Sequence, residues 1–158
     1  MDVRYINPFL TGAVEVLGTM ASVALKPQKP YLKQHEASTG DISGIIGVTG
    51  SGAMGSISVT FTFDLIQVVM KNMLGDDVSG LDDEVKDAVG ELTNQISGAA
   101  RRHLAQEGLS LQAGIPTVVA GKNHTIKHIV TGPVLVIPFE GPQGKMIVEV
   151  SLVMIKTK

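Results

Sequence analysis

The chain of 158 residues has no cysteine and no tryptophan, and only 4% of its residues are aromatic. The lack of cysteine excludes disulfide scaffolds, thiolate metal sites and cysteine nucleophiles. The scarcity of aromatic rings argues against a surface that stacks nucleic-acid bases. Basic and acidic residues number 13 and 15, for a net charge of -2. Because nucleic acids and anionic lipids need a concentrated basic surface, neither is an expected partner.

Long apolar runs are also lacking. No stretch approaches the roughly 20 apolar residues of a membrane span. Near the N-terminus Pro8 and Glu15 interrupt the apolar residues, so the run is too short for the core of a signal peptide. Hydrophobic residues make up 44% of the chain and charged residues 18%, which excludes intrinsic disorder. We therefore expect one folded domain over residues 1–158, located in the cytoplasm.

Three segments have apolar residues at three- and four-residue spacing, which predicts helices. They are Asn7–Leu25, Leu65–Leu74 and a third helix from Asp82 or Asp83 to about Gln106. Each ends near a residue that disfavours helix continuation, namely Pro27, Gly75 or Gly108. Asp64 is the expected N-cap of the second helix.

Alternating and β-rich segments account for most of the remaining chain. The expected strands are Ile42–Val48, Gly55–Phe63, Leu111–Val119, Thr125–Val130, Val134–Phe139 and Lys145–Ile155. Glycine-rich turns at 50–52 and 141–144 are expected to close two hairpins. The predicted class is α+β, with two long helices and a shorter one packed on an antiparallel sheet.

A long helix that leads to a hairpin occurs twice in this order. A shift of the sequence that places Gly50 on Gly141 also places Ile57 on Val148. The coincidence predicts a duplicated helix-plus-hairpin unit built around one sheet.

The third predicted helix separates apolar and polar residues onto opposite faces. At about 100° per residue its apolar side chains gather on one side, which must face the sheet. A polar stripe lies opposite and consists of Asp87, Glu91, Asn94 and Gly98, with Gly90 at its edge. An interior glycine lowers the stability of a helix by about 1 kcal/mol relative to alanine, so the presence of two glycines here needs an explanation. Close approach of a partner is one reason, and a solvated face with glycines kept for packing is the alternative.

The run from Asp87 to Asn94 resembles the motif of the CheC/CheX/FliY chemotaxis phosphatases, which is Asp or Ser, three residues, Glu, two residues and Asn. The chain is most similar to the CheX members, and the resemblance covers nearly all of it. Further segments that carry the likeness lie in the same order, at 2–7, 46–50, 73–75 and 116–121. The resemblance implies a CheC-like fold with the duplication described above.

The resemblance also implies an activity, which is hydrolysis of the aspartyl phosphate of a CheY-type response regulator. In the family, the Glu and Asn of the motif enter the regulator's active site, and these positions are Glu91 and Asn94 here. Because aspartyl phosphate is a reactive acyl phosphate, the catalyst mainly has to place a water in line with phosphorus. An uncharged amide both donates and accepts hydrogen bonds, so Asn94 is expected to orient that water. Glu91 is expected to pair with the regulator's lysine.

The remaining residues of the motif, Asp87, Gly90 and Gly98, are given supporting roles. Mg²⁺ is expected in the regulator's acidic pocket, and no metal or cofactor is expected on this chain. By resemblance, a homodimer is implied as well.

Two positions depart from the family pattern. Some relatives carry a second motif in the first helix, but here Glu15 is followed by Gly18 where an Asn would lie. A position without an amide cannot orient water, so one site per chain is expected. Thr93 replaces a residue that is often glycine, and a β-branched side chain there is expected to crowd the approach to the site.

Two other functions remain open from the sequence. A non-catalytic adaptor would bind a phosphorylated receiver domain through the same face. A hotdog-like thioesterase would use Asp87 or Glu91 as a base, although a hotdog has one central helix.

Arg101 and Arg102 lie near the end of the third helix, where cations suit the helix dipole, and contact with an acidic regulator is the alternative. His103 is expected on the packed side, bonded to carbonyl groups.

Overall fold

The computed structural model describes residues 3–33, 40–124 and 132–155. Its helices are α1 (Val3–Ala21), α2 (Phe63–Leu74) and α3 (Asp83–Gln106). Its strands are β1 (Lys26–Pro27), β2 (Tyr31–Leu32), β3 (Gly40–Thr49), β4 (Ala53–Phe61), β5 (Gln112–Ala113), β6 (Thr117–His124), β7 (Val134–Gly141) and β8 (Gly144–Met154). The predicted α+β class is confirmed.

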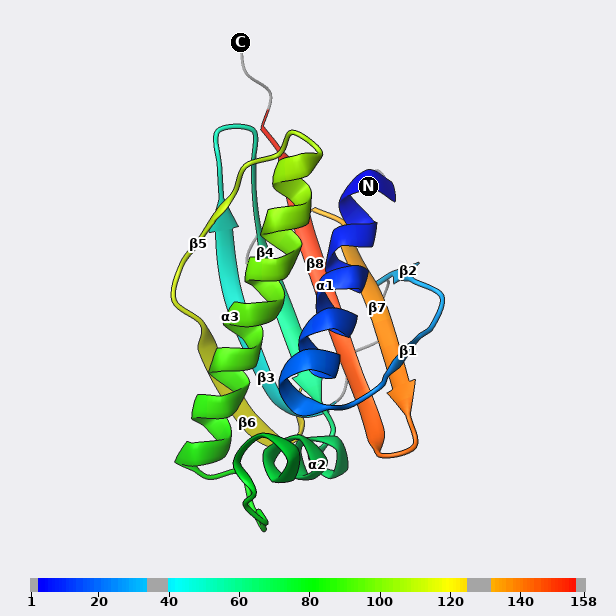
Figure 1. Cartoon of the computed structure of the whole chain (residues 1–158). Coiled ribbons are helices and arrows are strands. Elements are labelled where there is room, and N and C mark those ends of the chain that lie inside the picture. The colour runs from blue at the N-terminus through cyan, green and yellow to red at the C-terminus, as the bar shows by residue number, and fades with distance from the viewer. Residues whose placement is uncertain (1–2, 34–39, 125–131, 156–158) are drawn as a thin grey trace.

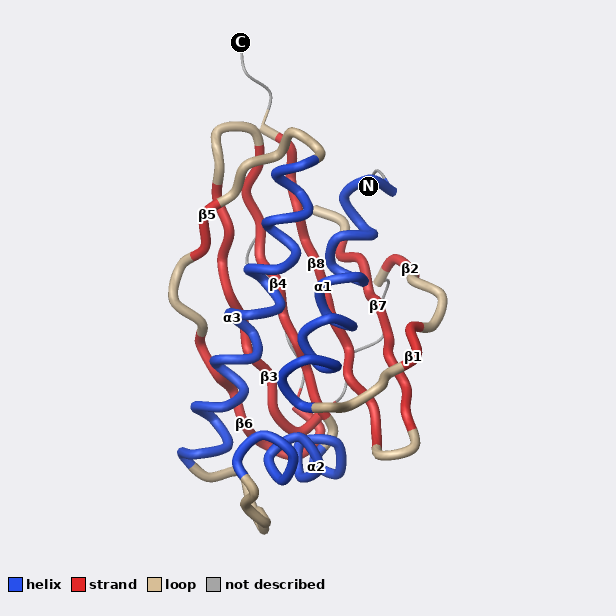
Figure 2. The backbone as a smooth tube through the Cα atoms, in the orientation of Figure 1, coloured by secondary structure: helices blue, strands red, loops and turns tan. Residues whose placement is uncertain are grey.

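The strands form one antiparallel sheet in the order β1-β7-β8-β4-β3-β5, with β2 paired to β7 and β6 paired to β3. Helices α1 and α3 lie side by side on one face of this sheet, and α2 crosses one end of it (Figure 1). Figure 2 shows the two hairpins, β3-β4 and β7-β8, meeting in the middle of the sheet. None of the helices in the described part of the chain is long and apolar enough to cross a membrane.

The central pairing of β4 with β8 supports the predicted duplication. Ser58 lies opposite Glu149, and the shift that places Gly50 on Gly141 also places Ser58 on Glu149. The neighbouring pairs agree, since Ile57 faces Val150 while Val59 faces Val148. A pseudo-twofold axis therefore passes through the Ser58 and Glu149 pair and relates the two hairpins.

The two long helices approach each other closely at Gly12. A Cβ atom placed on Gly12 would lie 3.1 Å from the backbone nitrogen of Ala100 and 3.2 Å from the Cβ of Ala99. Such contacts are tighter than ordinary van der Waals packing, so a larger residue would push α1 away from α3. Helix α1 thus supports α3 from one side while the sheet supports it from below.

The predicted bounds of the first helix were wrong at both ends. Helix α1 begins at Val3, so it contains Pro8, and it ends at Ala21 rather than Leu25. Ser22 adopts a left-handed backbone with φ of 51°, which stops the helix, and the amide of Val23 then donates to the carbonyl of Leu17 at 3.0 Å.

The start of the second helix also differs from the prediction. Thr62, not Asp64, occupies the N-cap position, so β4 ends at Phe61. The amide of Phe63 donates to Asp41 Oδ2 of β3 at 2.8 Å, while Asp64 accepts from Leu65. A side chain from the sheet therefore caps this helix, which local sequence does not reveal. The predicted C-terminal Gly75 is confirmed, with φ of 75°.

The region after α3 contains two separate strands where the sequence predicted one. Instead of one strand at 111–119, the chain forms β5 and β6, separated by a segment that contains Pro116, which has no amide to donate to a sheet. The predicted strand at 125–130 lies outside the described residues. Strands β1 and β2 were not predicted, because two residues are too few to show an alternating pattern.

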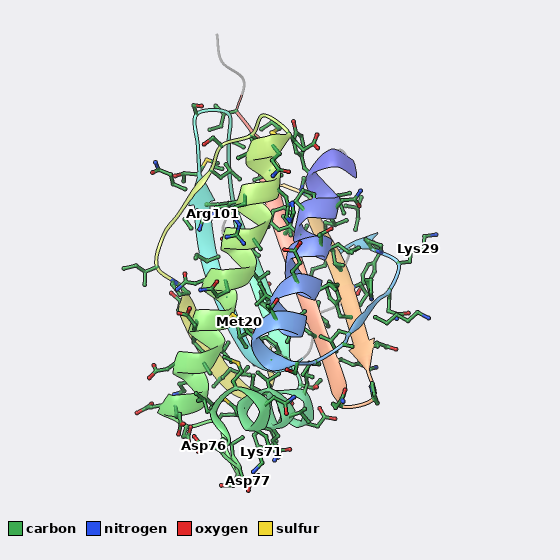
Figure 3. All side chains as sticks on the ribbon, viewed as in Figure 1. Met20, Lys29, Lys71, Asp76, Asp77 and Arg101 are labelled. Carbon is green, nitrogen blue, oxygen red and sulfur yellow. The ribbon has the colours of Figure 1, made fainter. Side chains whose placement is uncertain are left out.

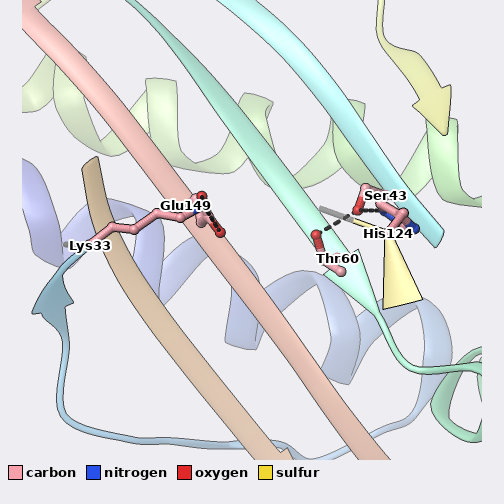
Figure 4. Close-up of polar contacts among 5 residues, drawn as sticks. All are labelled: Lys33, Ser43, Thr60, His124 and Glu149. Atoms are coloured by element: carbon pink, nitrogen blue, oxygen red, sulfur yellow. Dashed lines mark hydrogen bonds and ion pairs between the residues drawn. The ribbon is translucent and has the colours of Figure 1, made fainter. Parts of the chain in front are cut away.

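The face of the sheet opposite the helices is polar and buried. Lys33 Nζ lies 3.1 Å from the Oε1 of Glu149, whose side chain is 0% exposed. Ser43 Oγ lies 2.6 Å from Thr60 Oγ1 and 2.6 Å from the Nε2 of His124 (Figure 4). These groups have partners within the fold, so we regard them as structural.

Candidate active site on helix α3

Helix α3 is held firmly at its start and along its inner side. The Asp82 side chain accepts a hydrogen bond from the amide of Val85 at 3.0 Å, as expected of an N-cap. The helix buries Val85, Ala88, Val89, Leu92, Thr93, Ile96, Ser97, Ala99, Ala100 and Leu104. Because this inner face is packed, the direction of the outer face is fixed.

The polar stripe lies on that outer face. Asp87, Glu91 and Asn94 are all exposed, while the residues between them are mostly buried. Residues three and four apart on a helix have Cβ atoms about 5–6 Å apart, so Glu91 and Asn94 can enter one partner site together. The structure thus places the two predicted catalytic side chains next to each other, with Asp87 one turn before them.

Glu91 has one neighbour that the sequence interpretation missed. Gln95 Nε2 donates a hydrogen bond to Glu91 Oε1 at 2.8 Å. This bond holds one carboxylate oxygen on the outer surface. The spacing of four residues between Glu91 and Gln95 was the available sign of such a contact.

The prediction for Thr93 was wrong. Its side chain is buried, and its Oγ1 donates to the carbonyl of Val89 at 2.7 Å. A Cβ placed on Gly44 of β3 would collide with this hydroxyl, so Thr93 points into the sheet. Thr93 therefore lies on the inner face of the helix and does not crowd the exposed side chains of Glu91 and Asn94 on the outer face.

The two supporting glycines have different surroundings. A Cβ on Gly90 would lie 3.6 Å from Val118 Cγ2 and 4.0 Å from Pro116 Cγ, so Gly90 borders the strand region around β6. A Cβ on Gly98 would instead lie near the guanidinium groups of Arg101 and Arg102 on the outer face. Gly98 is thus the glycine that leaves the outer face open.

Charge is distributed unevenly along α3. Its first turns carry Asp83, Glu84 and Asp87, which suit the positive end of the helix dipole. A side-chain hydrogen bond with Asp76, together with the negative charge of Asp76, raises the pKa of Glu84. The second half of the helix carries Arg101 and Arg102, so the start of the helix is acidic and its second half is basic.

The corresponding surface of α1 is occupied differently. Glu15 Oε1 lies 3.4 Å from the Nε2 of His103 on α3. The predicted bonding of His103 to carbonyl groups was wrong, because its half-buried side chain faces this carboxylate instead. A Cβ on Gly18 would have no neighbour within 4 Å.

Among the described residues, no group of three histidine, aspartate or glutamate side chains is arranged to hold a metal ion.

Comparisons with known proteins identify a family for this chain. The sequence profile of the family described as the chemotaxis phosphatase CheX matches residues 42–140. The CheY-P phosphatase CheX of Thermotoga maritima is 30% identical over 139 residues, which cover 87% of this chain and 88% of that protein. The chain belongs to the CheX family of chemotaxis phosphatases, so the predicted family and enzyme class are confirmed.

Solved structures give the same result. The chemotaxis protein CheX of Vibrio vulnificus is 44% identical, with a TM-score of 0.92 over 96% of this chain and 100% of that one. CheX of Borrelia burgdorferi, solved as a complex with CheY, BeF3 and Mg²⁺, is 28% identical, with a TM-score of 0.77 over 94% and 97% of the two chains. The CheC-like fold is therefore shared along nearly the whole chain.

Proposed function

We propose that this protein hydrolyses the aspartyl phosphate of a CheY-type response regulator by inserting Glu91 and Asn94 into the regulator's active site. The observation that carries the proposal is the exposure of these two side chains, one turn apart, on the outer face of a helix whose inner face is packed. The Thermotoga relative is a CheY-P phosphatase, and the Borrelia relative is solved bound to CheY, which supports a partner of this kind.

Asn94 is the residue proposed to orient water. In the reaction the oxygen of water forms a bond to phosphorus, and the bond from phosphorus to the aspartyl carboxylate breaks, which releases inorganic phosphate and the free carboxylate. An amide accepts a hydrogen bond from the water and carries no charge that would repel the phosphoryl group. Held on a packed helix, it presents the water in one direction, which supplies the positioning that this reaction requires.

Glu91 is proposed to dock on the regulator. A carboxylate beside a phosphoryl group would be repelled unless a cation lay between them, and the regulator's active-site lysine is such a cation. The hydrogen bond from Gln95 keeps Glu91 Oε1 on the surface before binding. Asp87 is given a supporting role one turn earlier, and Mg²⁺ is assigned to the regulator rather than to this chain.

We extend the proposal to location and assembly. A response regulator works in the cytoplasm, so we place this protein there, and we keep the homodimer that the family resemblance implies. The thioesterase alternative loses its basis, since the chain has two long helices and belongs to the CheX family. The adaptor alternative uses the same face and is separated by the experiment below.

The test is the decay of a phosphorylated CheY-type regulator with and without the protein. We expect the wild type to accelerate decay and Asn94→Ala to lower turnover about 100-fold or more, the size of effect seen when one transition-state contact is removed. Binding to the regulator should persist. Gln106→Ala, which removes an exposed amide elsewhere on α3, is the matched control. Equal turnover by Asn94→Ala would contradict the mechanism, and binding without any acceleration would favour the adaptor.

A further inference from the structure

Two arginines flank the polar stripe beyond Asn94. Arg101 and Arg102 follow Gly98 by three and four residues, so they lie on either side of it on the outer face. Side chains on a helix lean toward its N-terminus, which brings both guanidinium groups back over Gly98. A Cβ placed on Gly98 would lie 3.7 Å from Arg102 Nη1 and 3.8 Å from Arg101 Nη2. Figure 3 labels Arg101 on the side of α3 that faces away from α1.

Hydrogen bonds from the arginines to the end of the helix do not explain this arrangement. The last carbonyls of α3 already accept backbone hydrogen bonds, since Leu104 accepts from Glu107 and Leu109, and Ala105 accepts from Gly108. Arg101 Nε instead donates to Ser97 Oγ at 3.3 Å, in the direction of the helix N-terminus. The direction of the Arg101 side chain is therefore set by its bond to Ser97 and not by a bond to the carbonyls at the helix end.

A shallow, open depression of about 280 Å³ lies beside the two side chains. Its lining consists of Gly98, Arg101, Arg102, Ala105 and Leu111, which we call the arginine cleft. The lining contains no carboxylate, and no ion pair joins either guanidinium to an acidic side chain of the described residues. Two neighbouring cations without a counter-charge repel each other, and a bound anion would remove this repulsion.

We propose that the arginine cleft is a docking subsite that receives a carboxylate side chain of the response regulator. The inference rests on the proposed phosphatase function, because it requires the regulator to lie against the outer face of α3. Guanidinium groups present several donors in a planar fork that matches a carboxylate, so two of them give both charge and direction. Gly98 serves this subsite by leaving its floor free of side-chain atoms.

The position of the arginine cleft makes the inference specific. Gly98 lies four residues after Asn94, which is about 6 Å along the helix axis. A suitable regulator therefore presents a lysine toward Glu91 and an acidic side chain about one helical turn beyond the phosphoryl group. Such opposite charges at two points fix one orientation of the partner and disfavour regulators with a basic residue at the second point.

The experiment compares two double variants that remove the same charge. Arg101→Gln with Arg102→Gln empties the arginine cleft of cations, whereas Lys26→Gln with Lys29→Gln removes two exposed lysines near β1. Figure 3 labels Lys29 on the opposite side of the molecule from Arg101. In the decay assay we expect the arginine double variant to raise KM about tenfold with kcat unchanged, and to flatten the dependence of KM on salt. The lysine double variant should leave KM within about twofold of wild type.

A second variant tests the floor of the cleft without changing charge. In Gly98→Ala the new Cβ meets the guanidinium groups at ordinary contact distances, so the fold should tolerate it, and the better helix former should raise the urea midpoint. We nevertheless expect KM to rise several-fold, because the methyl group occupies the space that the carboxylate needs. A purely structural role for Gly98 predicts no rise in KM.

A measurement of binding to a beryllofluoride-activated regulator, made beside the decay assay, distinguishes failure of this inference from failure of the proposed function. If the wild type hydrolyses the regulator, and the arginine double variant has the same KM and the same dependence on salt, the docking role of the arginine cleft is wrong. The proposed phosphatase function would then remain valid. If the wild type binds the regulator without hydrolysing it, and the arginine double variant binds it more weakly, the docking role of the arginine cleft is supported. The proposed phosphatase function would then be wrong. If the wild type neither binds nor hydrolyses, both are wrong.

Discussion

Helices α1 and α3 hold equivalent places in the two halves of the fold, yet only α3 carries the proposed site. Each presents an exposed glutamate on its outer surface, Glu15 on α1 and Glu91 on α3. Three residues later α3 has Asn94, whereas α1 has Gly18. The two glutamates also differ in their contacts, since Glu15 faces the imidazole of His103 and Glu91 accepts from the amide of Gln95. The scaffold is thus duplicated, and a few exposed side chains decide where chemistry is possible.

The inner surfaces of the two helices also differ. Thr93 of α3 reaches the sheet where Gly44 leaves room for it, so α3 is anchored from below. Helix α1 buries Phe9 and Leu17 in the common core and approaches α3 closely at Gly12. We infer that α1 supports the helix that carries the proposed site, and this role can be tested directly.

The largest effect is expected from Gly12→Val. The added side chain would meet the backbone of Ala100 at closer than ordinary contact, so the helices must separate. Overpacking of this kind lowers the free energy of unfolding by about 1–3 kcal/mol, and urea denaturation measures it. Gly18→Val is the matched control in the same helix, because nothing lies within 4 Å of its added Cβ. Equal stability of the two variants would show that α1 and α3 are not tightly coupled.

A smaller effect is expected when both glutamates are neutralised in turn. Glu91→Gln should weaken binding of the activated regulator about tenfold, since the charge-assisted pair with a lysine is lost while a similar shape remains. Glu15→Gln makes the same chemical change on α1, where the carboxylate is half-exposed and faces the imidazole of His103, and should alter binding less than twofold. Titration of the regulator with each variant gives the comparison. If Glu15→Gln weakens binding as much as Glu91→Gln, the site is not confined to α3.

The bounds of α3 were predictable because its cap and its periodicity agree. Asp82 stands as an N-cap before the first apolar residue, and the apolar spacing continues to the end of the helix. The end of α1 was not predictable, because it depends on the left-handed backbone of Ser22, a residue type that usually avoids it. The cap of α2 comes from Asp41, which only the sheet brings near.

The candidate site also has one part that the sequence predicts and another part that depends on contacts between elements. Helical spacing alone placed Glu91 and Asn94 together on the outer face, and the structure agrees. The surroundings of Thr93 depend on Gly44, a residue on another element, so the sequence predicted an obstruction that does not exist. The direction of Arg101 was also out of reach, since it follows from its bond to Ser97 rather than from its position near the helix end.

The smallest effect is expected from Gly18→Asn, which completes on α1 the spacing of glutamate and amide found on α3. A side chain fits there, because a Cβ on Gly18 has no neighbour within 4 Å. We nevertheless expect less than a twofold change in regulator decay, because the imidazole of His103 lies 3.4 Å from Glu15 Oε1 and would hinder a lysine from approaching this carboxylate.

Adding His103→Ala to Gly18→Asn releases Glu15 and sharpens the test. If the double variant in an Asn94→Ala background restores measurable decay, the contact between Glu15 and His103 had kept the second site inactive. If it restores none, an amide and a free carboxylate at the right spacing are insufficient on α1. Docking would then require features that only α3 has, and the arginine cleft beyond Asn94 is the first of these to examine.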